Sequence, residues 1–527
     1  MLALQAAALL LLGVALCQPA AVPEDLKQSS AQAPVLDAVK NRFQYRRLGY
    51  LPPPPRPGRM LRASPVEELY VEQILDHFTV TDKRTWQQRY FKRTDMYEDG
   101  GPVFIYIGGE SQEGASRLAD FGLYLTYMAQ LLRAKTYSLE HRYYGKSHPL
   151  PDLTTASLQY LSADQALADL AYFIEFLKKS GEIEDGQPVA VFGGSYPGNL
   201  AAWARQKYPH LIKTAISSSA PVHAKADFVE YMEVVGRSLN RVAGEFCFNN
   251  IKKATDRVVE LLKTTEGYAT VKKVFRMSTE LKDKLDLDAF FETLSSPFAG
   301  AVQYNRDHPP KSVYSIKYIC SFMAGDDLTP DEAMSKLSKL VLGEPADPNK
   351  TFDWSYKSSI KQYQRTEYVQ DKSGEFSSDR QWIYQTCTEF GYYQTFSGKD
   401  IPFPSGYNDI QYSYQTCKDL FGDDFDEKLI TGAVERSNLV FGDRSPDVTN
   451  VLYINGNVDP WHALGILRNV SATKAPAFVV DGGSHCADMD YPDDTSDSDE
   501  IKAAHEMVHQ FLRTTLYEVP DGQPADG

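Results

Sequence analysis

The sequence lacks an excess of basic residues. It contains 55 lysines and arginines against 70 aspartates and glutamates, so the 527 residues carry a formal charge of −15. A negative field of this size repels phosphate backbones and anionic lipid surfaces, and we therefore expect neither nucleic acid nor a membrane as a partner. Hydrophobic residues make up 43% and charged residues 24%, which excludes global disorder and allows a large packed core.

A second long apolar run is also absent. The one such run extends from Ala6 to Cys17 and is shorter than the roughly 20 residues that a membrane span needs. It matches a secretory signal peptide, residues 1–17, because Ala15 and Cys17 place small side chains before a cleavage site. A buried N-terminal helix or a signal anchor is the alternative, since no basic residue precedes the run. The signal peptide predicts a secreted or lysosomal protein.

Cysteine is scarce, and one of the six cysteines, Cys17, would leave with the signal peptide. In an oxidising compartment, four of the remaining five are expected to form two disulfides. A single sequence does not determine their connectivity, but sequential pairing is the simplest choice and leaves Cys486 as the odd cysteine. The expected pairs are Cys247 with Cys320 and Cys387 with Cys417. Sequons at Asn349 and Asn469 also fit a secretory route.

Repeats of the kind that build solenoids are not present, and the chain divides by composition instead. Residues 18–63 show little periodic apolar pattern and contain four successive prolines from Pro52 to Pro55, which is typical of a polyproline-like spacer. We interpret this stretch as a linker or propeptide-like arm. Docking of a partner onto the prolines is the alternative reading.

Short apolar runs alternate with helical patterns beyond residue 63. A run at 189–192, a glycine turn, a helix ending near Lys207 and a run at 214–216 form a βαβ unit, which indicates a parallel α/β sheet. Apolar spacing predicts a further helix at 163–179. The segment 223–435 has longer helical patterns than the alternating segments before it and is far longer than a loop. It therefore predicts an inserted, mostly helical cap domain. Other strands are expected at 103–107, 136–139, 451–454 and 477–480.

Ser195 lies in the turn between the strand and the helix of this βαβ unit. Such a sharp turn lifts a serine above the sheet, where a base reaches its hydroxyl and the next backbone N–H faces an oxyanion. The strict motif has glycine two residues after the serine, whereas Pro197 stands there and Gly198 follows. Proline is tolerated in a first helical turn. The alternative is a glycine-rich loop with an incidental serine.

An acid and a histidine follow Ser195 in the chain order that a nucleophile elbow requires. Asp459 comes just past the strand expected at 451–454, and His485 comes just past the one expected at 477–480. His462 competes with His485, but it follows the acid too closely and precedes any further strand. The predicted catalytic residues are therefore Ser195, Asp459 and His485.

Their roles define a mechanism of acyl transfer. His485 takes the proton of Ser195, Asp459 orients the imidazole, and Ser195 forms an acyl-enzyme that water hydrolyses. The N–H groups of Tyr196 and Gly109 are the expected oxyanion donors. Glu110, next to Gly109, is a candidate for binding a substrate amine, with a solvated loop carboxylate as the alternative.

The segment from His505 to His509 matches the H-E-x-x-H pattern of zinc enzymes. A catalytic zinc needs a third protein ligand, and no histidine follows His509. We therefore expect no metal and no cofactor. The acidic run at 488–500 is interpreted as a solvated loop, because its spacing does not fit an EF-hand, although calcium binding is the alternative.

Several motifs together resemble the serine exopeptidase family that includes prolyl carboxypeptidase and dipeptidyl peptidase II. The segments around Asp459 and His485 are most similar to the thymus-specific serine protease branch. The resemblance covers about residue 65 to the C-terminal helix. The matching motifs are 71–78, 88–91, Glu140-His141-Arg142-Tyr143-Tyr144-Gly145-Lys146-Ser147, the Ser195 turn, Asp459-Pro460-Trp461-His462 and Gly483-Ser484-His485-Cys486.

This resemblance implies an α/β-hydrolase fold with a large helical cap inserted between sheet strands, and cleavage of peptides near a terminus, often after proline. It carries Ser195, Asp459 and His485 over as the triad, and Trp461 is a further candidate for substrate binding. An esterase or lipase and a catalytically inactive binding protein are the rival functions, and homodimer formation is left open. The expected hydrolase segments are 64–222 and 436–527, on either side of the cap.

Overall fold

The computed structural model describes residues 65–306, 312–343, 347, 349–471 and 474–517. The predicted signal peptide and the proline-rich arm lie outside these residues. Within the described ranges, no helix is both long enough and apolar enough to cross a membrane.

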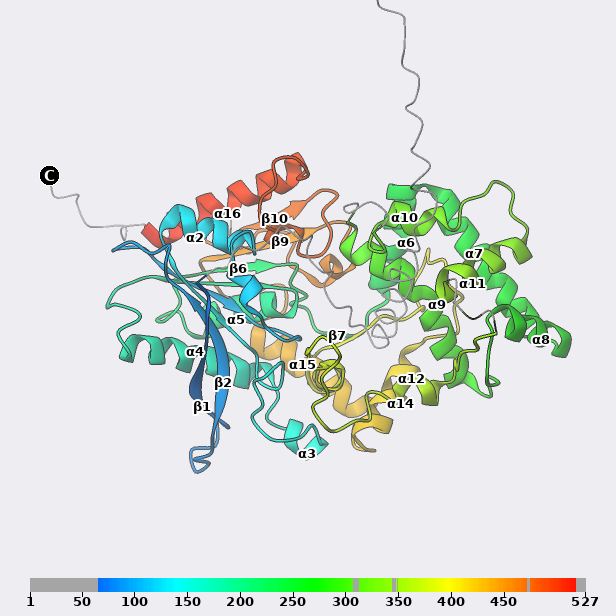
Figure 1. Cartoon of the computed structure of the whole chain (residues 1–527), viewed down its shortest axis with the longest axis horizontal. Coiled ribbons are helices and arrows are strands. Elements are labelled where there is room, and N and C mark those ends of the chain that lie inside the picture. Colours follow the sequence, from blue (N-terminus) through cyan, green and yellow to red (C-terminus); the bar gives the residue numbers. More distant parts are fainter. Residues whose placement is uncertain (1–64, 307–311, 344–346, 348, 472–473, 518–527) are drawn as a thin grey trace, which may run out of the picture.

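An eight-stranded mixed sheet forms the centre of the hydrolase part (Figure 1). Its strand order is β1-β2-β4-β3-β5-β6-β9-β10. β1 pairs antiparallel with β2, and β2 pairs antiparallel with β4, whereas all remaining neighbours are parallel. The strands are β1 Glu67–Ile74, β2 Thr85–Arg93, β3 Val103–Ile107, β4 Lys135–Leu139, β5 Val189–Gly194, β6 Thr214–Ser218, β9 Val451–Gly456 and β10 Ala477–Val480.

Helices cover both faces of this sheet, and its central strands β3, β4, β6 and β9 are buried along their whole length. Along β3, Val103 and Ile105 pack on one side with α4 and α5, while Phe104 and Tyr106 pack on the other with α2 and α16. The covering helices are α2 Tyr124–Leu132, α4 Ala163–Lys179, α5 Tyr196–Lys207 and α16 Asp499–Tyr517.

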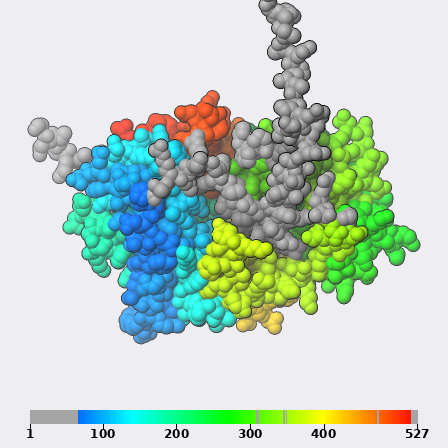
Figure 2. All heavy atoms as spheres, viewed as in Figure 1, coloured from blue at the N-terminus to red at the C-terminus, as the bar shows by residue number. Residues whose placement is uncertain are grey.

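A mostly helical region is inserted between β6 and β9 and lies beside the sheet (Figure 1). Figure 2 shows the yellow surface of this region next to the blue surface of the first strands, with the green surface further away on the right. The predicted boundary at residue 435 falls within α15. The elements are β7 Lys225–Asp227, α6 Val229–Ala243, α7 Glu245–Leu261, α8 Thr265–Val274, α9 Lys284–Tyr304, α10 Ile316–Ser321, α11 Pro330–Leu342, α12 Tyr356–Ile360, α13 Asp379–Gln385, a π-helix Thr386–Phe390, β8 Gly391–Tyr393, α14 Ile410–Phe421 and α15 Glu427–Phe441.

Two disulfides lie within this inserted region. Cys247 in α7 joins Cys320 in α10, and Cys387 in the π-helix joins Cys417 in α14. Cys486 is a free thiol. The sequential pairing expected from the sequence is thus the one that the structure contains, and it indicates an extracytoplasmic protein.

One hydrophobic cluster runs from the sheet into the inserted region. It includes Val191 of β5, Leu200 of α5, Leu239 of α6 and Phe298 of α9. The mostly parallel sheet, its two helical layers and the helical insertion confirm the expected α/β-hydrolase fold.

Candidate active site

Ser195 occupies the turn that joins β5 to α5. Its backbone has φ 65° and ψ −135°, a conformation that non-glycine residues rarely adopt. The Ser195 N–H donates to the carbonyl of Ser218 in β6 at 2.9 Å, which stabilises the turn. The side chain is half-buried. This is the strained strand-to-helix geometry that a nucleophilic serine requires.

Pro197, which departs from the strict elbow motif, packs against the loop after β3. A Cβ atom on Gly109 would lie 2.2 Å from Cγ of Pro197, so the proline ring fills the space that a side chain would need. Pro197 is in the first turn of α5, where its missing N–H costs little. The proline therefore brings the Gly109 loop into contact with the serine turn.

Asp459 and His485 form a buried pair at the ends of β9 and β10. Oδ2 of Asp459 lies 2.7 Å from Nδ1 of His485, and the two residues are 0% and 4% exposed. Oδ1 of Asp459 accepts the backbone N–H of Trp461 at 3.0 Å. With both carboxylate oxygens engaged, Asp459 has one orientation and holds His485 through Nδ1, which leaves Nε2 for chemistry.

The pKa of His485 is set by opposing effects. Burial lowers it, but the Asp459 carboxylate and the neighbouring Cys486 thiol outweigh burial and raise the pKa well above its ordinary value. A histidine that acts as a base must be neutral, so activity should fall as the pH decreases through this raised pKa.

The serine turn and the histidine loop lie against each other. A Cβ atom on Gly194, immediately before Ser195, would approach Sγ of Cys486 to 2.9 Å. The Cys486 N–H donates to the hydroxyl of Ser219 at 2.9 Å, just past β6. The structure thus brings the three predicted triad residues to one edge of the sheet.

The two predicted oxyanion donors are next to the Gly109–Pro197 contact, because Gly109 is one partner in it and Tyr196 directly precedes Pro197. Among the described residues, neither the Tyr196 N–H nor the Gly109 N–H has a hydrogen-bond acceptor. Glu110 follows Gly109 and is half-buried. Burial raises the pKa of Glu110 to about 7, while the positive charge of His485 opposes that rise. Glu110 therefore belongs to the same electrostatic environment as the histidine.

The inserted region also contacts the histidine loop, through the end of α9. The His485 N–H donates to the carbonyl of Gln303 at 2.8 Å, and the Ser484 hydroxyl donates to the carbonyl of Tyr304 at 3.0 Å. The Gln303 side-chain oxygen accepts the indole N–H of Trp461 at 3.1 Å and the hydroxyl of Tyr231 at 2.7 Å. Trp461 is 4% exposed, so its contribution here is to pack around Asp459; substrate binding by Trp461 stays a prediction.

The competing histidines have structural partners. Nδ1 of His462 lies 2.5 Å from the backbone carbonyl of Asp459, not from its carboxylate. His505 stacks on Tyr124 with ring centroids 4.2 Å apart, and His509 lies 3.7 Å from Glu506. In the part of the chain that the structure describes, no group of three or more histidine, cysteine or acidic side chains is arranged to hold a metal ion.

The interpretation of 488–500 as a solvated loop is wrong for its first residue. Asp488 is 5% exposed and accepts the Ser218 hydroxyl at 2.5 Å. Burial raises its pKa to about 7. The carbonyl of Ser218 also accepts the Ser195 N–H, so Ser218 links the Asp488 carboxyl to the serine turn. The predicted glycosylation sites, Asn349 and Asn469, are exposed.

Two residues that contact the site were not predicted. Gln303 lies in a cap helix far from the motifs in sequence, and no spacing signal identifies it. Glu140 follows β4 directly and organises the loop of Gly109, as described below. The rule that identified Asp459, a polar residue just past a strand end, would have identified Glu140 as well.

Comparison with known proteins finds a family model, relatives and solved structures that are similar to this chain. The family model described as Serine carboxypeptidase S28 matches residues 73–508. The thymus-specific serine protease of Mus musculus is 33% identical over 86% of this chain and 88% of its own length. The lysosomal Pro-X carboxypeptidase of Pongo abelii is 26% identical over 79% and 82%. A solved proline iminopeptidase of Mycobacterium smegmatis covers 85% of this chain and 99% of its own, with 12% identity and a TM-score of 0.34.

Replacing Asp459 with asparagine should reduce kcat on the order of 10⁴-fold, because the imidazole loses the partner that sets its tautomer. The midpoint of the acidic limb of the kcat/KM profile should also move to lower pH, since Asp459 raises the pKa of His485. Steady-state kinetics from pH 4 to 9 measure both. Asp481→Asn is the control, because Asp481 is exposed and lies in the loop after β10 that contains His485. An unchanged profile in Asp459→Asn would contradict the assignment.

Gln303→Leu should lower kcat several-fold and the melting temperature by several degrees. The substitution removes the side-chain acceptor that Tyr231 and Trp461 share, at about 1–3 kcal/mol for the buried indole N–H of Trp461, and loosens the packing beside Asp459. Asn250→Leu removes a buried amide that donates to Met323 and Gly325 elsewhere in the inserted region. We expect Asn250→Leu to lower the melting temperature and leave kcat per active site unchanged. If Gln303→Leu and Asn250→Leu lower kcat equally, the contact of α9 with the histidine loop has no special role in catalysis.

Proposed function

The chain belongs to the serine carboxypeptidase S28 family, and we propose that it is a serine exopeptidase that removes residues from a terminus of short peptides. The observation that carries the proposal is the Ser195 turn packed against the loop of a buried Asp459–His485 pair. The inserted helical region lies beside this edge of the sheet and would restrict access for long or folded substrates.

In this mechanism neutral His485 takes the Ser195 proton as the hydroxyl attacks the scissile carbonyl. Asp459 stabilises the imidazolium, and the N–H groups of Tyr196 and Gly109 stabilise the oxyanion. His485 then protonates the leaving amine, and water hydrolyses the acyl-enzyme by the same route in reverse. Each step uses a group that the geometry leaves available.

Glu110 would select the substrate terminus. Its half-buried carboxyl, with a pKa raised by burial to about 7, is ready to ionise when a cation binds beside it. A substrate α-ammonium group provides that cation, whereas a terminal carboxylate would be repelled. We therefore favour removal of residues from the amino terminus.

Mass spectrometry of a peptide library tests the proposed function. The wild-type protein should release short terminal fragments, and both cleavage and fluorophosphonate labelling should be lost in Ser195→Ala. The residue before each cleaved bond shows whether proline is required, as the name of the Pro-X carboxypeptidase suggests for that relative. Turnover of p-nitrophenyl or triglyceride esters without peptide cleavage would favour an esterase or lipase. Cleavage in the middle of folded proteins would contradict an exopeptidase.

Glu110→Gln should raise KM about tenfold for peptides with a free amino terminus. The same peptides with an acetylated terminus should bind the wild type and the variant equally, because they carry no ammonium group. If Glu110→Gln changes KM equally for the free and the acetylated peptides, Glu110 has a structural role and the exopeptidase proposal still stands.

We expect a secreted or lysosomal location, and the buried carboxyl groups make the stability of the protein depend on pH. Burial raises the pKa values of four of them to about 7, against about 4 in an unfolded chain. Between about pH 4 and pH 7 the folded state binds more protons than the unfolded chain does. The free energy of unfolding therefore decreases as the pH rises towards about 7. The four are Glu110, Asp379, Glu389 and Asp488.

We therefore expect a higher melting temperature at pH 5 than at pH 8. Buried His141, with a pKa lowered by burial to about 4, and His148 and His505, whose pKa values burial also lowers, act in the opposite sense. The four carboxyls and His485, whose pKa is raised, outnumber these three histidines and leave the acidic side favoured. Asp488→Asn should reduce the difference between the two pH values, as measured by thermal unfolding. A melting temperature that rises steadily to pH 8 would contradict this balance.

A further inference from the structure

The loop that contains Gly109 and Glu110 is fixed at both ends to the strand beside it. At its start, the Gly108 N–H donates to the carbonyl of Leu139, the last residue of β4, at 2.8 Å. At its end, the Glu113 N–H donates to Oε1 of Glu140 at 3.0 Å. Only four residues lie between these anchors, so both hydrogen bonds restrict the backbone of the segment that contains Gly109.

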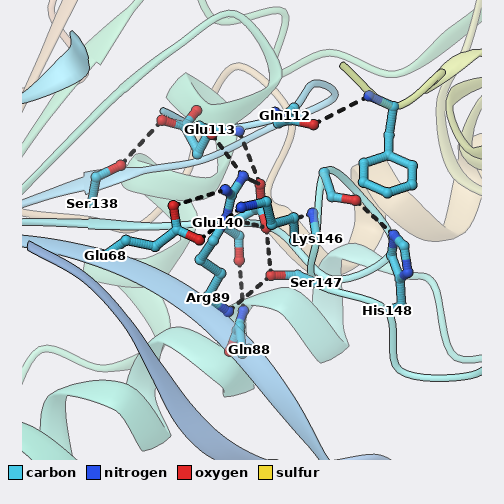
Figure 3. Close-up of polar contacts among 12 residues, drawn as sticks. Glu68, Gln88, Arg89, Gln112, Glu113, Ser138, Glu140, Lys146, Ser147 and His148 are labelled. Atoms are coloured by element: carbon cyan, nitrogen blue, oxygen red, sulfur yellow. Dashed lines mark hydrogen bonds and ion pairs between the residues drawn. The ribbon is translucent and has the colours of Figure 1, made fainter. Parts of the chain in front are cut away.

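Glu140 is fully buried, and its carboxylate accepts five hydrogen bonds (Figure 3). Arg89 of β2 donates two of them, from Nε at 3.1 Å and Nη2 at 2.5 Å. The Ser147 hydroxyl and the Lys146 N–H donate at 2.7 and 3.0 Å, and Glu113 supplies the fifth. A buried carboxylate with all its acceptor sites filled and an arginine partner is held rigidly.

Glu113 is held by more than its N–H. Its carbonyl accepts Nη2 of Arg89 at 2.8 Å, and its carboxylate accepts the Ser138 hydroxyl of β4 at 3.1 Å. Figure 3 shows Glu113, Glu140 and Arg89 meeting at the end of β4. We refer to Glu140, Arg89, Glu113 and Ser138 as the Glu140 brace.

The surroundings leave the brace little freedom. A Cβ atom on Gly145 would lie 1.9 Å from Oε1 of Glu140, and Gly145 has φ 54°, so glycine is required there for two reasons. Gln112, within the loop, accepts the Phe376 N–H of the inserted region at 3.1 Å. The loop is therefore fixed from the sheet on one side and from the inserted region on the other.

We propose that the Glu140 brace is the positioning device of the oxyanion site: it holds the Gly109 N–H at the place where negative charge develops on the substrate. The proposal rests on the proposed function, because it assigns the brace a part in the Ser195 reaction. A donor aimed in advance costs no reorganisation during the reaction, and losing one such donor typically reduces kcat 10²–10³-fold. The brace touches no substrate atom and acts through the loop.

Two variants and one matched control test the brace. Glu140→Gln replaces an acceptor oxygen with a donor and removes the nearer of the two carboxylates that pair with Arg89, the other being Glu68 at 3.5 Å. Ser138→Ala removes one hydroxyl that holds Glu113 and changes no charge. Thr136→Val is the control: Thr136 is two residues away on β4, is also fully buried, and donates its hydroxyl to the Arg93 carbonyl at 2.9 Å.

The measurements are kcat per titrated active site, the melting temperature, and inhibition by a peptide boronate, whose adduct on Ser195 places an oxygen in the oxyanion site. We expect kcat to decrease on the order of 10²-fold in Glu140→Gln and several-fold in Ser138→Ala. The boronate inhibition constant should rise by the same factors. Thr136→Val should lower the melting temperature as much as Ser138→Ala and leave kcat and boronate inhibition within twofold.

Equal kcat values in Ser138→Ala and Thr136→Val, at equal loss of stability, would overturn the proposal. If Glu140→Gln does not fold, the comparison of Ser138→Ala with Thr136→Val tests the proposal by itself. Activity that survives in Ser195→Ala would refute the proposed function. Activity that is lost in Ser195→Ala but unaffected in the brace variants would refute only the brace.

Discussion

Parallel pairing of the strands from β4 to β10 is the constraint on which the candidate site depends. Because these strands point the same way, the loops that follow β3, β5, β9 and β10 emerge at one edge. Each loop carries one part of the chemistry: Gly109, Ser195, Asp459 and His485 in that order. β3, β5 and β9 are buried almost throughout, whereas the edge strand β10 is partly exposed. A shift in the register of any of these strands would displace the catalytic loop that follows it.

The inserted region lies beside this edge of the sheet and also holds two of its loops in place. The end of α9 holds the His485 loop through the Gln303 and Tyr304 carbonyls, and the Phe376 N–H holds Gln112 in the loop after β3. A lid that swings freely would break both sets of hydrogen bonds. Access to the serine must therefore come from smaller movements than the separation of the two parts.

Much of the sheet and the candidate triad could be predicted because their signals are local. A continuous apolar run that ends in glycine or a polar residue predicted β3 and β10 with their bounds, and it predicted β5 and β9, which extend two residues further. The helix expected at 163–179 matches α4. The β1–β2 hairpin gave a weaker signal, since β1 alternates exposed and buried side chains only along part of its length. The contacts of Gln303 and the burial of Asp488 depend on residues more than 150 positions away, which no local pattern records.

The insertion between β6 and β9 also imposes an order on synthesis. The Thr214 hydroxyl of β6 bonds the Asn450 carbonyl across 236 residues, so β6 waits for its partner while the whole insertion is made. At about 5–20 residues per second, this interval is roughly 10–50 s. During that time β6 is an unpaired strand edge, open to pairing with other nascent chains. The yield of folded protein would then depend more on protection of this edge by chaperones than on the stability of the folded core.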